Sequence, residues 1–406
     1  MRILHTADWH LGKRMEQFDR TEEHQDFLDW LIDKLKSEKI DVLIVAGDIF
    51  DSGAPSNTAL EQYYHFLRNV KDTDCHDVVI VGGNHDSIST LNAPKALLKY
   101  FNVHIVGGVP EIFSDQVIPI YDKNKQIELV ICAVPFLRDR DIRLSISGET
   151  TLEREARIKQ GIVDHYQNLV EHIAVHKDNN IPVIATGHLY AAGASTSESE
   201  KDIHIGNLGQ VAGDQFPKEF NYIALGHLHR PQKVNKMDYV RYSGSPIPLS
   251  FSENDDRKQV VIIEFGGGAV KIEELEVPCC RRLVRISGTL DSVRSQILIL
   301  EDEGLKYPSW IELKIETNAF IPDLNEQLDK LKTGKPFIGH FFPRQLLIRP
   351  SQQIQQLTTE AMALNDLDPK SVFLKKCEAV YGNTKQPELI ATFQEALEAL
   401  QQEGDL

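Results

Sequence analysis

The residues from Val42 to Asp51 constrain the fold of this chain more than any other stretch. Residues 42–46 are an apolar run of β-favouring side chains that ends abruptly at Gly47 and Asp48, which is typical of a buried parallel strand. In open α/β sheets ligands bind beyond the carboxyl ends of the strands, so the pattern places Asp48 where a functional carboxylate is expected. Taken alone, Asp48 is equally consistent with a turn or an N-cap residue.

The same pattern, an apolar strand followed by polar residues, occurs four more times. It occupies residues 3–10, 78–86, 183–188 and 222–229. A single His at the end of an apolar strand is more often a core or surface residue than a ligand, but the carboxyl ends of neighbouring strands in an α/β fold converge. The predicted metal ligands are therefore Asp8, His10, Asp48, Asn84, His188, His227 and His229.

This set of side chains supplies enough oxygen and nitrogen donors for two divalent ions that share one bridging carboxylate. Such a pair of ions holds a phosphate oxygen, lowers the pKa of a bound water and stabilises an in-line displacement, so no protein nucleophile is needed. His85 adjoins Asn84 and is predicted to donate a proton to the departing oxygen, with Asp86 holding its other ring nitrogen. The alternative for His85 is a purely structural role.

The remaining patterns predict an α/β fold with two packed sheets. The first strands should be parallel with right-handed crossovers, and the closely spaced strands that follow indicate a second sheet. Helices are expected over residues 26–35, 57–70, 93–100 and 152–176, and further strands over 103–106, 117–120, 129–134, 240–242, 259–265 and 269–277. The predicted fold class is a two-sheet βαβ sandwich, followed by a small α+β domain and a C-terminal helical hairpin.

We expect three parts, with boundaries near residues 277 and 350. Residues 1–277 form the main domain, and residues 278–350 form a small α+β domain in which strand, helix, strand, helix and strand follow in order. Residues 351–406 contain two amphipathic helices, 368–381 and 387–400, which either pack on the chain itself or dock against helices of a partner. Their apolar stripes include Phe373, Leu374, Phe393 and Leu397.

Charge and composition narrow the functional classes. The formal net charge of −16 argues against a free-standing, nonspecific nucleic-acid binder. Residues 278–350 differ, with 11 Lys or Arg and 9 Asp or Glu, so they are a candidate for approaching a phosphate backbone or simply a solvated surface of different composition. No apolar run approaches the roughly 18–20 residues that cross a bilayer, and the first residues enter a strand rather than a signal segment, which predicts a cytoplasmic protein.

The cysteines match neither the spacing of a zinc site nor that of a disulfide framework, so we expect all of them to be reduced. They are Cys75, Cys132, Cys279, Cys280 and Cys377.

The order Asp-x-His, Gly-Asp, Gly-Asn-His-Asp, Gly-His and Gly-His-x-His resembles the signature of the calcineurin-like metallophosphoesterases, and every part of it is present. Longer stretches at residues 5–13, 47–51, 224–232 and 242–246 are similar to the nucleases of this family that work with an SbcC-type coiled-coil ATPase. The resemblance covers at least residues 1–277. The order and size of the two later parts fit the capping domain and the ATPase-docking helices of that group.

This resemblance implies a division of the ligands between two ions. Asp8, His10, Asp48 and His229 would hold one ion, and Asp48, Asn84, His188 and His227 would hold the other. Mn²⁺ is the ion that the family implies, although the ligand set is also compatible with zinc, iron or magnesium. His85 falls on the family's proton-donor position.

The implied function is that of the metal-dependent DNA nuclease in a larger complex, an exonuclease on duplex ends and an endonuclease on single strands or hairpins, in DNA repair, recombination and replication. It would act as a homodimer within a heterotetramer, where the SbcC-type ATPase supplies much of the DNA binding that an acidic chain lacks. One alternative is a stand-alone phosphoesterase for a small phosphodiester or phosphomonoester, which leaves the residues after 277 unexplained. Another is an inactive scaffold of the same fold, which the complete ligand set disfavours.

Overall fold

The computed structural model describes residues 1–142, 149–174, 181–200, 211–266 and 269–347, together with Phe373, Cys377, Leu389, Thr392 and Phe393. Residues Met1–Leu347 form one compact unit and Ile348–Leu406 a second. The described residues of the second unit are helical, and the rings of Phe373 and Phe393 stack with centroids 3.9 Å apart. The remainder of the two predicted tail helices, including Leu374 and Leu397, lies outside the described residues.

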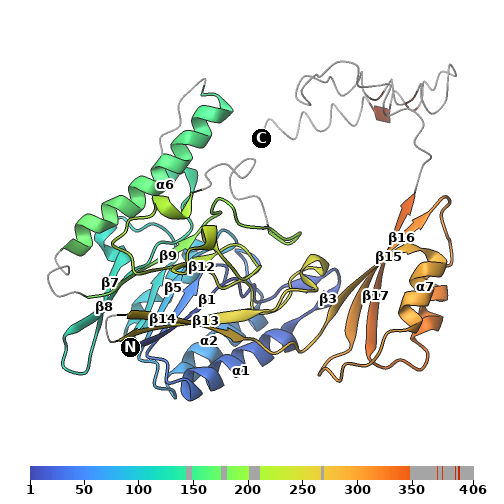
Figure 1. Cartoon of the computed structure of the whole chain (residues 1–406), viewed down its shortest axis with the longest axis horizontal. Coiled ribbons are helices and arrows are strands. Elements are labelled where there is room, and N and C mark those ends of the chain that lie inside the picture. The colour runs from blue at the N-terminus through green and yellow to red at the C-terminus, as the bar shows by residue number, and fades with distance from the viewer. Residues whose placement is uncertain are drawn as a thin grey trace. The chain divides into compact units, whose positions relative to one another are not determined.

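The first sheet has six strands in the order β14-β13-β1-β4-β5-β6 (Figure 1). Its strands are β1 (Arg2–Thr6), β4 (Val42–Ala46), β5 (Asp77–Val81), β6 (Val103–Val106), β13 (Gln259–Gly266) and β14 (Ala269–Glu276). β1, β4, β5 and β6 run parallel, whereas β13 pairs antiparallel with both β1 and β14. The predicted parallel start is confirmed, and it brings the carboxyl ends of β1, β4 and β5 to one edge.

The second sheet also has six strands, in the order β11-β12-β10-β9-β8-β7. Its strands are β7 (Val117–Tyr121), β8 (Ile127–Cys132), β9 (Val183–His188), β10 (Tyr222–Gly226), β11 (Gln232–Lys233) and β12 (Val240–Tyr242). β8, β9, β10 and β12 run parallel, and the two edge strands pair antiparallel. The second sheet expected from the sequence is therefore present.

An apolar layer joins the two sheets. Ile3, Ile44 and Val79 of the first sheet belong to the same fully buried cluster as Ile131 and Ile184 of the second. Helices α1 (Thr21–Ser37) and α2 (Asn57–Val70) cover the other face of the first sheet, and α6 (Thr151–Ile173) covers the other face of the second (Figure 1). Each helix buries an apolar stripe, and the sequence predicted a helix in each of these three segments.

The helix expected over residues 93–100 is present with slightly shorter bounds, and a second short helix, which the sequence did not predict, precedes it. Pro94 separates α3 (Ile88–Asn92) from α4 (Lys95–Lys99) and serves as the N-cap residue of the second. Proline lacks an N–H, so a helix tends to restart after it rather than run through it. The other short elements are α5 (Asp139–Ile142) and the 3-10 helices η1 (Phe113–Gln116), η4 (Gly213–Gln215), η5 (Val234–Lys236), η6 (Phe251–Glu253) and η7 (Lys330–Lys332).

The region after β14 contains the predicted alternation of strands and helices, which we call the small region (residues 283–347). Its elements are β15 (Leu283–Thr289), α7 (Leu290–Leu298), β16 (Ser309–Thr317), α8 (Leu324–Asp329) and β17 (Ile338–Leu347). Its sheet has the order β15-β16-β17 and is parallel throughout, so the small region is α/β rather than the expected α+β. Each strand is joined to the next by a helical crossover, which makes parallel pairing possible.

A short hairpin contacts the small region. It consists of β2 (Arg14–Met15) and β3 (Phe18–Asp19), and the ring of Phe18 stacks on that of His340 with centroids 3.7 Å apart. Phe18 also packs against a buried cluster that includes Phe251, Trp310 and Phe342. The chain between β1 and α1 therefore packs directly on the small region.

Two expectations about the whole chain can be compared with the structure. All five cysteines lie at described positions, and each is a free thiol. Across the described ranges, every helix is too short or too polar to traverse a lipid bilayer.

Candidate metal centre

The carboxyl ends of five strands, from both sheets, supply the predicted ligands. Asp8 and His10 follow β1, Asp48 follows β4, Asn84 follows β5, His188 ends β9, and His227 and His229 follow β10. The charged and imidazole members of this set are at most 3% exposed, and only Asn84 is partly exposed. Polar groups of this kind are rarely buried unless they are paired or coordinate a metal.

The backbone adopts uncommon conformations at four of these residues. The φ angles are 53° at Asp8, 47° at His10, 51° at Asp48 and 99° at His227. For residues with a Cβ, such left-handed conformations cost about 1–3 kcal/mol each and persist only where the surroundings impose them. Here the β1 and β4 loops hold one another, because the N–H groups of Asp8 and His10 donate to the carbonyls of Gly47 and Asp48, each across 3.0 Å.

Two glycines allow the ligands to approach closely. A Cβ at Gly47 would lie 2.2 Å from Nδ1 of His188, and the φ of 92° at Gly47 also favours glycine. A Cβ at Gly83 would lie 2.1 Å from Oδ1 of Asp48. Both glycines belong to the Gly-Asp and Gly-Asn-His-Asp motifs, so these motifs leave space for neighbouring ligands as well as supplying their own.

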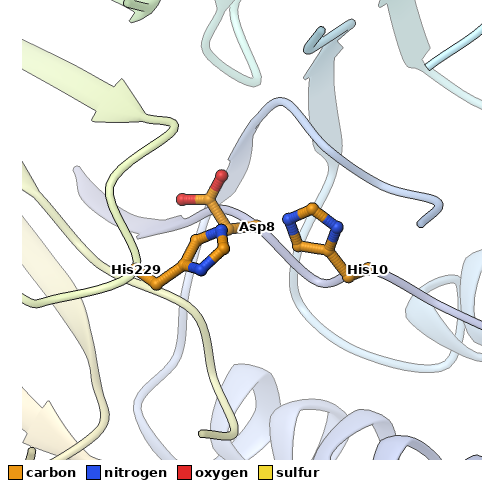
Figure 2. A group of neighbouring side chains, drawn as sticks. All are labelled: Asp8, His10 and His229. Atoms are coloured by element: carbon orange, nitrogen blue, oxygen red, sulfur yellow. The ribbon is translucent and has the colours of Figure 1, made fainter. Parts of the chain in front are cut away.

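Asp8, His10 and His229 form one group of candidate ligands, with ligand atoms within 4.8 Å of one another (Figure 2). The rings of His10 and His229 meet edge to face, with centroids 5.0 Å apart. Within the described ranges, Oδ2 of Asp8 and both ring nitrogens of His10 are buried without a hydrogen-bond partner. Because buried polar atoms are nearly always paired, these open donor atoms fit a bound cation.

Asp48 lies between this group and a second one. Its Oδ2 is 3.4 Å from Nε2 of His10 and 3.4 Å from Nε2 of His188. Asp8, Asp48 and His188 form another cluster with metal-ligand spacing. Beyond them, Oδ1 of Asn84 lies 2.9 Å from Nε2 of His188 and 3.3 Å from Nδ1 of His227. All of the predicted ligands are therefore brought together, with Asp48 at the centre.

The electrostatics of the site are those of crowded, buried carboxylates. Burial, together with the charge of Asp48, raises the pKa of Asp8 to about 7. Burial would also raise the pKa of Asp48, but the neighbouring His188 and His10 hold it well below its usual range. Burial lowers the pKa of His188, yet the Asp48 and Asp8 carboxylates outweigh this and raise it to about 9. The buried Asp48 carboxylate is thus stabilised by positive charge on the neighbouring imidazoles, and a bound divalent cation would supply such charge as well.

The contacts of His85 differ from those expected. The backbone N–H of His85 donates to Oδ1 of Asp48 across 2.9 Å, and ring atom Nδ1 lies 2.7 Å from the carbonyl oxygen of Asp51. Asp86, expected against the other ring nitrogen, instead accepts hydrogen bonds from the N–H groups of Ile49, Phe50 and Gly83. The carbonyl of Asp51 therefore takes the place predicted for Asp86 beside His85, while Asp86 ties the β4 and β5 loops together.

Sequence reasoning missed several residues around the site. Asp51 lies within ligand distance of His10 and His85, and its Oδ1 is 3.0 Å from Nζ of Lys13. The available signal was its position three residues after Asp48. Ser199, Glu200 and Glu253 contact His229, and no spacing in the sequence relates them to it.

Two protein-family models match this chain. A model of the calcineurin-like phosphoesterase family matches residues 1–231. A second model, described as the type 5 capsule protein repressor C-terminal domain, matches residues 279–381. The first match contains every predicted ligand, and the second contains the small region.

Several full-length relatives are similar to this chain, and each is the D component of an SbcCD nuclease. The protein of Escherichia coli K12 is 36% identical over 381 residues, which cover 93% of this chain and 92% of the relative. The protein of Bacillus subtilis 168 is 29% identical over 99% of both chains. That of Rhodobacter capsulatus is 32% identical over 89% of this chain and 93% of its own. The similarity therefore extends well beyond the predicted metal ligands.

Proposed function

The chain belongs to the calcineurin-like phosphoesterase family and, within it, to the D components of SbcCD nucleases, and on this premise we propose how it acts on DNA. It is a phosphoesterase, and we assign it exonuclease activity on duplex ends and endonuclease activity on single strands and hairpins. The observation that carries the proposal is the buried convergence of Asp8, His10 and Asp48 with histidines of the second sheet, with donor atoms left open.

The proposed arrangement holds two ions. One would be held by Asp8, His10, Asp48 and His229 and the other by Asp48, Asn84, His188 and His227, with Asp48 shared. Its central position, 3.4 Å from a ring nitrogen of His10 and of His188, supports this division. We propose Mn²⁺ as the ion because the family resemblance implies it, and the mixed imidazole and carboxylate ligands are compatible with it. When bound, such ions supply charge stabilisation at a phosphate and a water of lowered pKa.

His85 is proposed as the proton donor to the departing oxygen. It is only partly buried, unlike the neighbouring ligand histidines, and its ring meets that of His10 edge to face with centroids 4.7 Å apart. The carbonyl of Asp51 beside Nδ1 favours the tautomer in which Nδ1 carries a proton. In the protonated ring, Nε2 then has a proton to deliver. Asp86 would support this position indirectly, by holding the backbone of the β4 and β5 loops.

We further propose that the chain works with an SbcC-type coiled-coil ATPase, as a homodimer within a heterotetramer. Its relatives are each named as one component of a nuclease complex, which supports a partner. Residues 1–277 would form the nuclease domain, residues 278–350 a capping domain that approaches DNA, and residues 351–406 a helical hairpin that docks the ATPase. The stacked rings of Phe373 and Phe393, 20 positions apart, are compatible with such a hairpin.

Manganese-dependent cleavage of a DNA hairpin, measured with and without the ATPase, tests this proposal. We expect cleavage that requires the metal and that ATP increases only when the partner is present. The Asp48→Asn variant is the matched control for contaminating nucleases. Hydrolysis of bis-p-nitrophenyl phosphate without any cleavage of DNA, alone or with the partner, would instead support the stand-alone phosphoesterase.

A further inference from the structure

His229 is held by a segment that lies 30 residues earlier in the chain. Oγ of Ser199 is 2.5 Å from Nδ1 of His229 and 2.5 Å from Oε1 of Glu253. Oε1 of Glu200 accepts a hydrogen bond from the N–H of His229 across 2.8 Å. We call residues 197–200 the support segment. It therefore contacts both the ring and the backbone of this proposed ligand.

The contacts of Ser199 determine the tautomer of His229. Glu253 is paired with the Lys258 ammonium, whose Nζ lies 2.6 Å from Oε2. The Ser199 hydroxyl donates to Oε1 of Glu253, and its oxygen also lies 2.7 Å from Oγ of Ser197. The Ser199 oxygen then accepts from Nδ1–H of His229. This leaves Nε2 without a proton and available as a ligand atom.

Glu253 ends this chain of hydrogen bonds, His229 to Ser199 to Glu253, in the core. It is fully buried, and its carboxylate also accepts hydrogen bonds from the hydroxyl of Ser197 and the N–H of Leu249. Lys258 connects the other side of the same histidine, because its Nζ donates to the carbonyl of His229 across 2.9 Å. Ring and backbone of His229 are thus joined to one buried ion pair.

The support segment also contacts the small region. The carboxylate of Glu198 forms a two-pronged ion pair with the guanidinium of Arg285 on β15, and Nζ of Lys314 on β16 lies 3.9 Å away. The neighbouring residue, Ser199, contacts His229. Adjacent residues of the chain therefore contact the small region and a proposed metal ligand.

From these contacts we infer that the support segment positions His229 for metal binding and makes that positioning depend on the small region through Glu198. Ser199 and Glu253 are positioning residues rather than catalytic ones, because they act through His229. The inference rests on the function proposed above. It adds that the seating of the small region on the main domain alters the affinity of the ion that His229 holds.

The first test is the affinity for Mn²⁺ of the full-length Ser199→Ala variant, measured by calorimetry and by the EPR signal of free Mn²⁺. Loss of a partner that orients a metal-bound histidine typically costs about 10–100-fold in affinity. We expect that loss for one of the two ions and little change for the other. Ser199→Thr keeps the hydroxyl and should restore the affinity.

Two further measurements distinguish positioning of His229 by Ser199 from a merely structural role of this serine. Without metal, Ser199→Ala should lower the melting temperature only by the loss of the hydroxyl's hydrogen bonds and should keep the cooperative transition of the unaltered protein, whereas a disrupted fold would lose it. Ser195→Ala is the matched control, because this serine lies in the same stretch but its hydroxyl contacts Gln232. It should bind Mn²⁺ with unaltered affinity.

The second test addresses the link to the small region. Glu198→Gln removes the charge that pairs with Arg285, and we expect a drop of about two- to fivefold in affinity for the same ion, the size typical of an accessible ion pair. Glu326→Gln, which breaks an exposed ion pair between Glu326 on α8 and Lys330 within the same small region, should have no effect. Because Glu198 and Ser199 act through one segment, their double variant should lose less than the product of the two single losses.

The outcomes separate this inference from the proposed function. If the unaltered protein binds two ions and cleaves DNA while Ser199→Ala binds Mn²⁺ equally well, the inference is wrong and the function stands. Equal losses in Ser199→Ala and Ser199→Thr would also overturn it, because the hydroxyl would then be irrelevant. A protein that binds no Mn²⁺ at all would refute the proposed function and the inference together.

Discussion

The backbone N–H of His85 donates to Oδ1 of Asp48 across 2.9 Å, so the proposed proton donor is held directly against the proposed bridging carboxylate. The other oxygen of Asp48, Oδ2, faces His10 and His188. Oδ1 thus accepts a hydrogen bond from the loop after β5, and Oδ2 faces the other proposed ligands. A change at Asp48 should therefore disturb the metal centre and the position of His85 together.

Asp48→Asn should abolish nuclease activity and weaken the binding of both ions. An amide can still accept from the N–H of His85 through its oxygen, but it then turns an NH₂ group toward the ligands and carries no charge. Elemental analysis of the purified variant, with a metal-dependent cleavage assay, checks this. A variant that retains two tightly bound ions and normal turnover would contradict the assignment of Asp48 as the shared ligand.

His85→Gln should keep both ions and the fold but cleave DNA about 10²–10⁴-fold more slowly, the usual contribution of a general acid. Cleavage of a p-nitrophenyl ester should suffer much less, because its weakly basic leaving group needs little help from a proton. His172→Gln, at an exposed position on α6, is the matched control. Equal losses with both substrates would assign His85 a structural role instead.

Gly83→Ala should disturb the metal centre, although it adds only one methyl group. The new Cβ would lie 2.1 Å from Oδ1 and 2.4 Å from the backbone nitrogen of Asp48. Overpacking of this kind typically costs about 1–3 kcal/mol, and here it also displaces a ligand. Urea denaturation and Mn²⁺ titration measure the two effects. Gly266→Ala, where no heavy atom lies within 4 Å of the added Cβ, should change neither.

The buried His165 should make the protein less stable in mild acid. Burial lowers its pKa to about 4, so it is neutral in the folded state, whereas the unfolded chain takes up a proton below about pH 6.5. A lowered folded-state pKa on a histidine means that stability is lost as pH falls from about 6.5 toward 4, by at most about 1.4 kcal/mol per pH unit.

His165→Gln should remove that part of the pH dependence, since glutamine does not titrate and can still contact Gln116, whose Oε1 lies 2.8 Å from Nε2 of His165. Urea unfolding of the metal-free protein between pH 4 and pH 7 provides the measurement. An identical slope in the variant and the unaltered protein would show that His165 takes up its proton in the folded state as readily as in the unfolded chain.

Removal of the chain after about residue 365 should abolish binding to the SbcC-type ATPase and ATP-stimulated cleavage. Mn²⁺ binding and hydrolysis of bis-p-nitrophenyl phosphate should persist, because every proposed ligand precedes residue 230. Co-purification of the shortened chain with the ATPase would contradict the docking proposal. Outright unfolding of the shortened chain would mean that the tail helices cover the protein's own core.

Local pattern was sufficient to predict the proposed ligands but not their surroundings. Asp48 and His188 follow apolar runs, and the rule that such strands end at one edge of an α/β fold is enough to bring them together. Ser199 and Glu253 are 54 residues apart and lie outside the strands that carry the ligands, so only the folded topology reveals that they meet at His229. Asp86 shows the same limit, because its neighbours are backbone N–H groups that no sequence pattern encodes.

In the small region the sequence predicted the correct order of elements but the wrong fold class, α+β instead of α/β. The order of strands and helices from Leu283 to Leu347 was predicted correctly, but strand direction depends on the path of the connections rather than on side-chain periodicity. The parallel register of β15, β16 and β17 therefore does not follow from alternation alone. Pro94 is the opposite case, since its effect on the helix is local and the sequence contained the signal.

The stack of Phe18 on His340 has a consequence for how such proteins can be recombined. A chimaera that exchanges only residues 279–347 would leave Phe18 facing a foreign surface and Glu198 without its guanidinium partner. An exchange that keeps these contacts would therefore have to include three separate segments of the sequence: the small region, the β2–β3 hairpin and the support segment. A crossover placed at the apparent boundary near residue 277 would separate Phe18 and Glu198 from the residues that they contact.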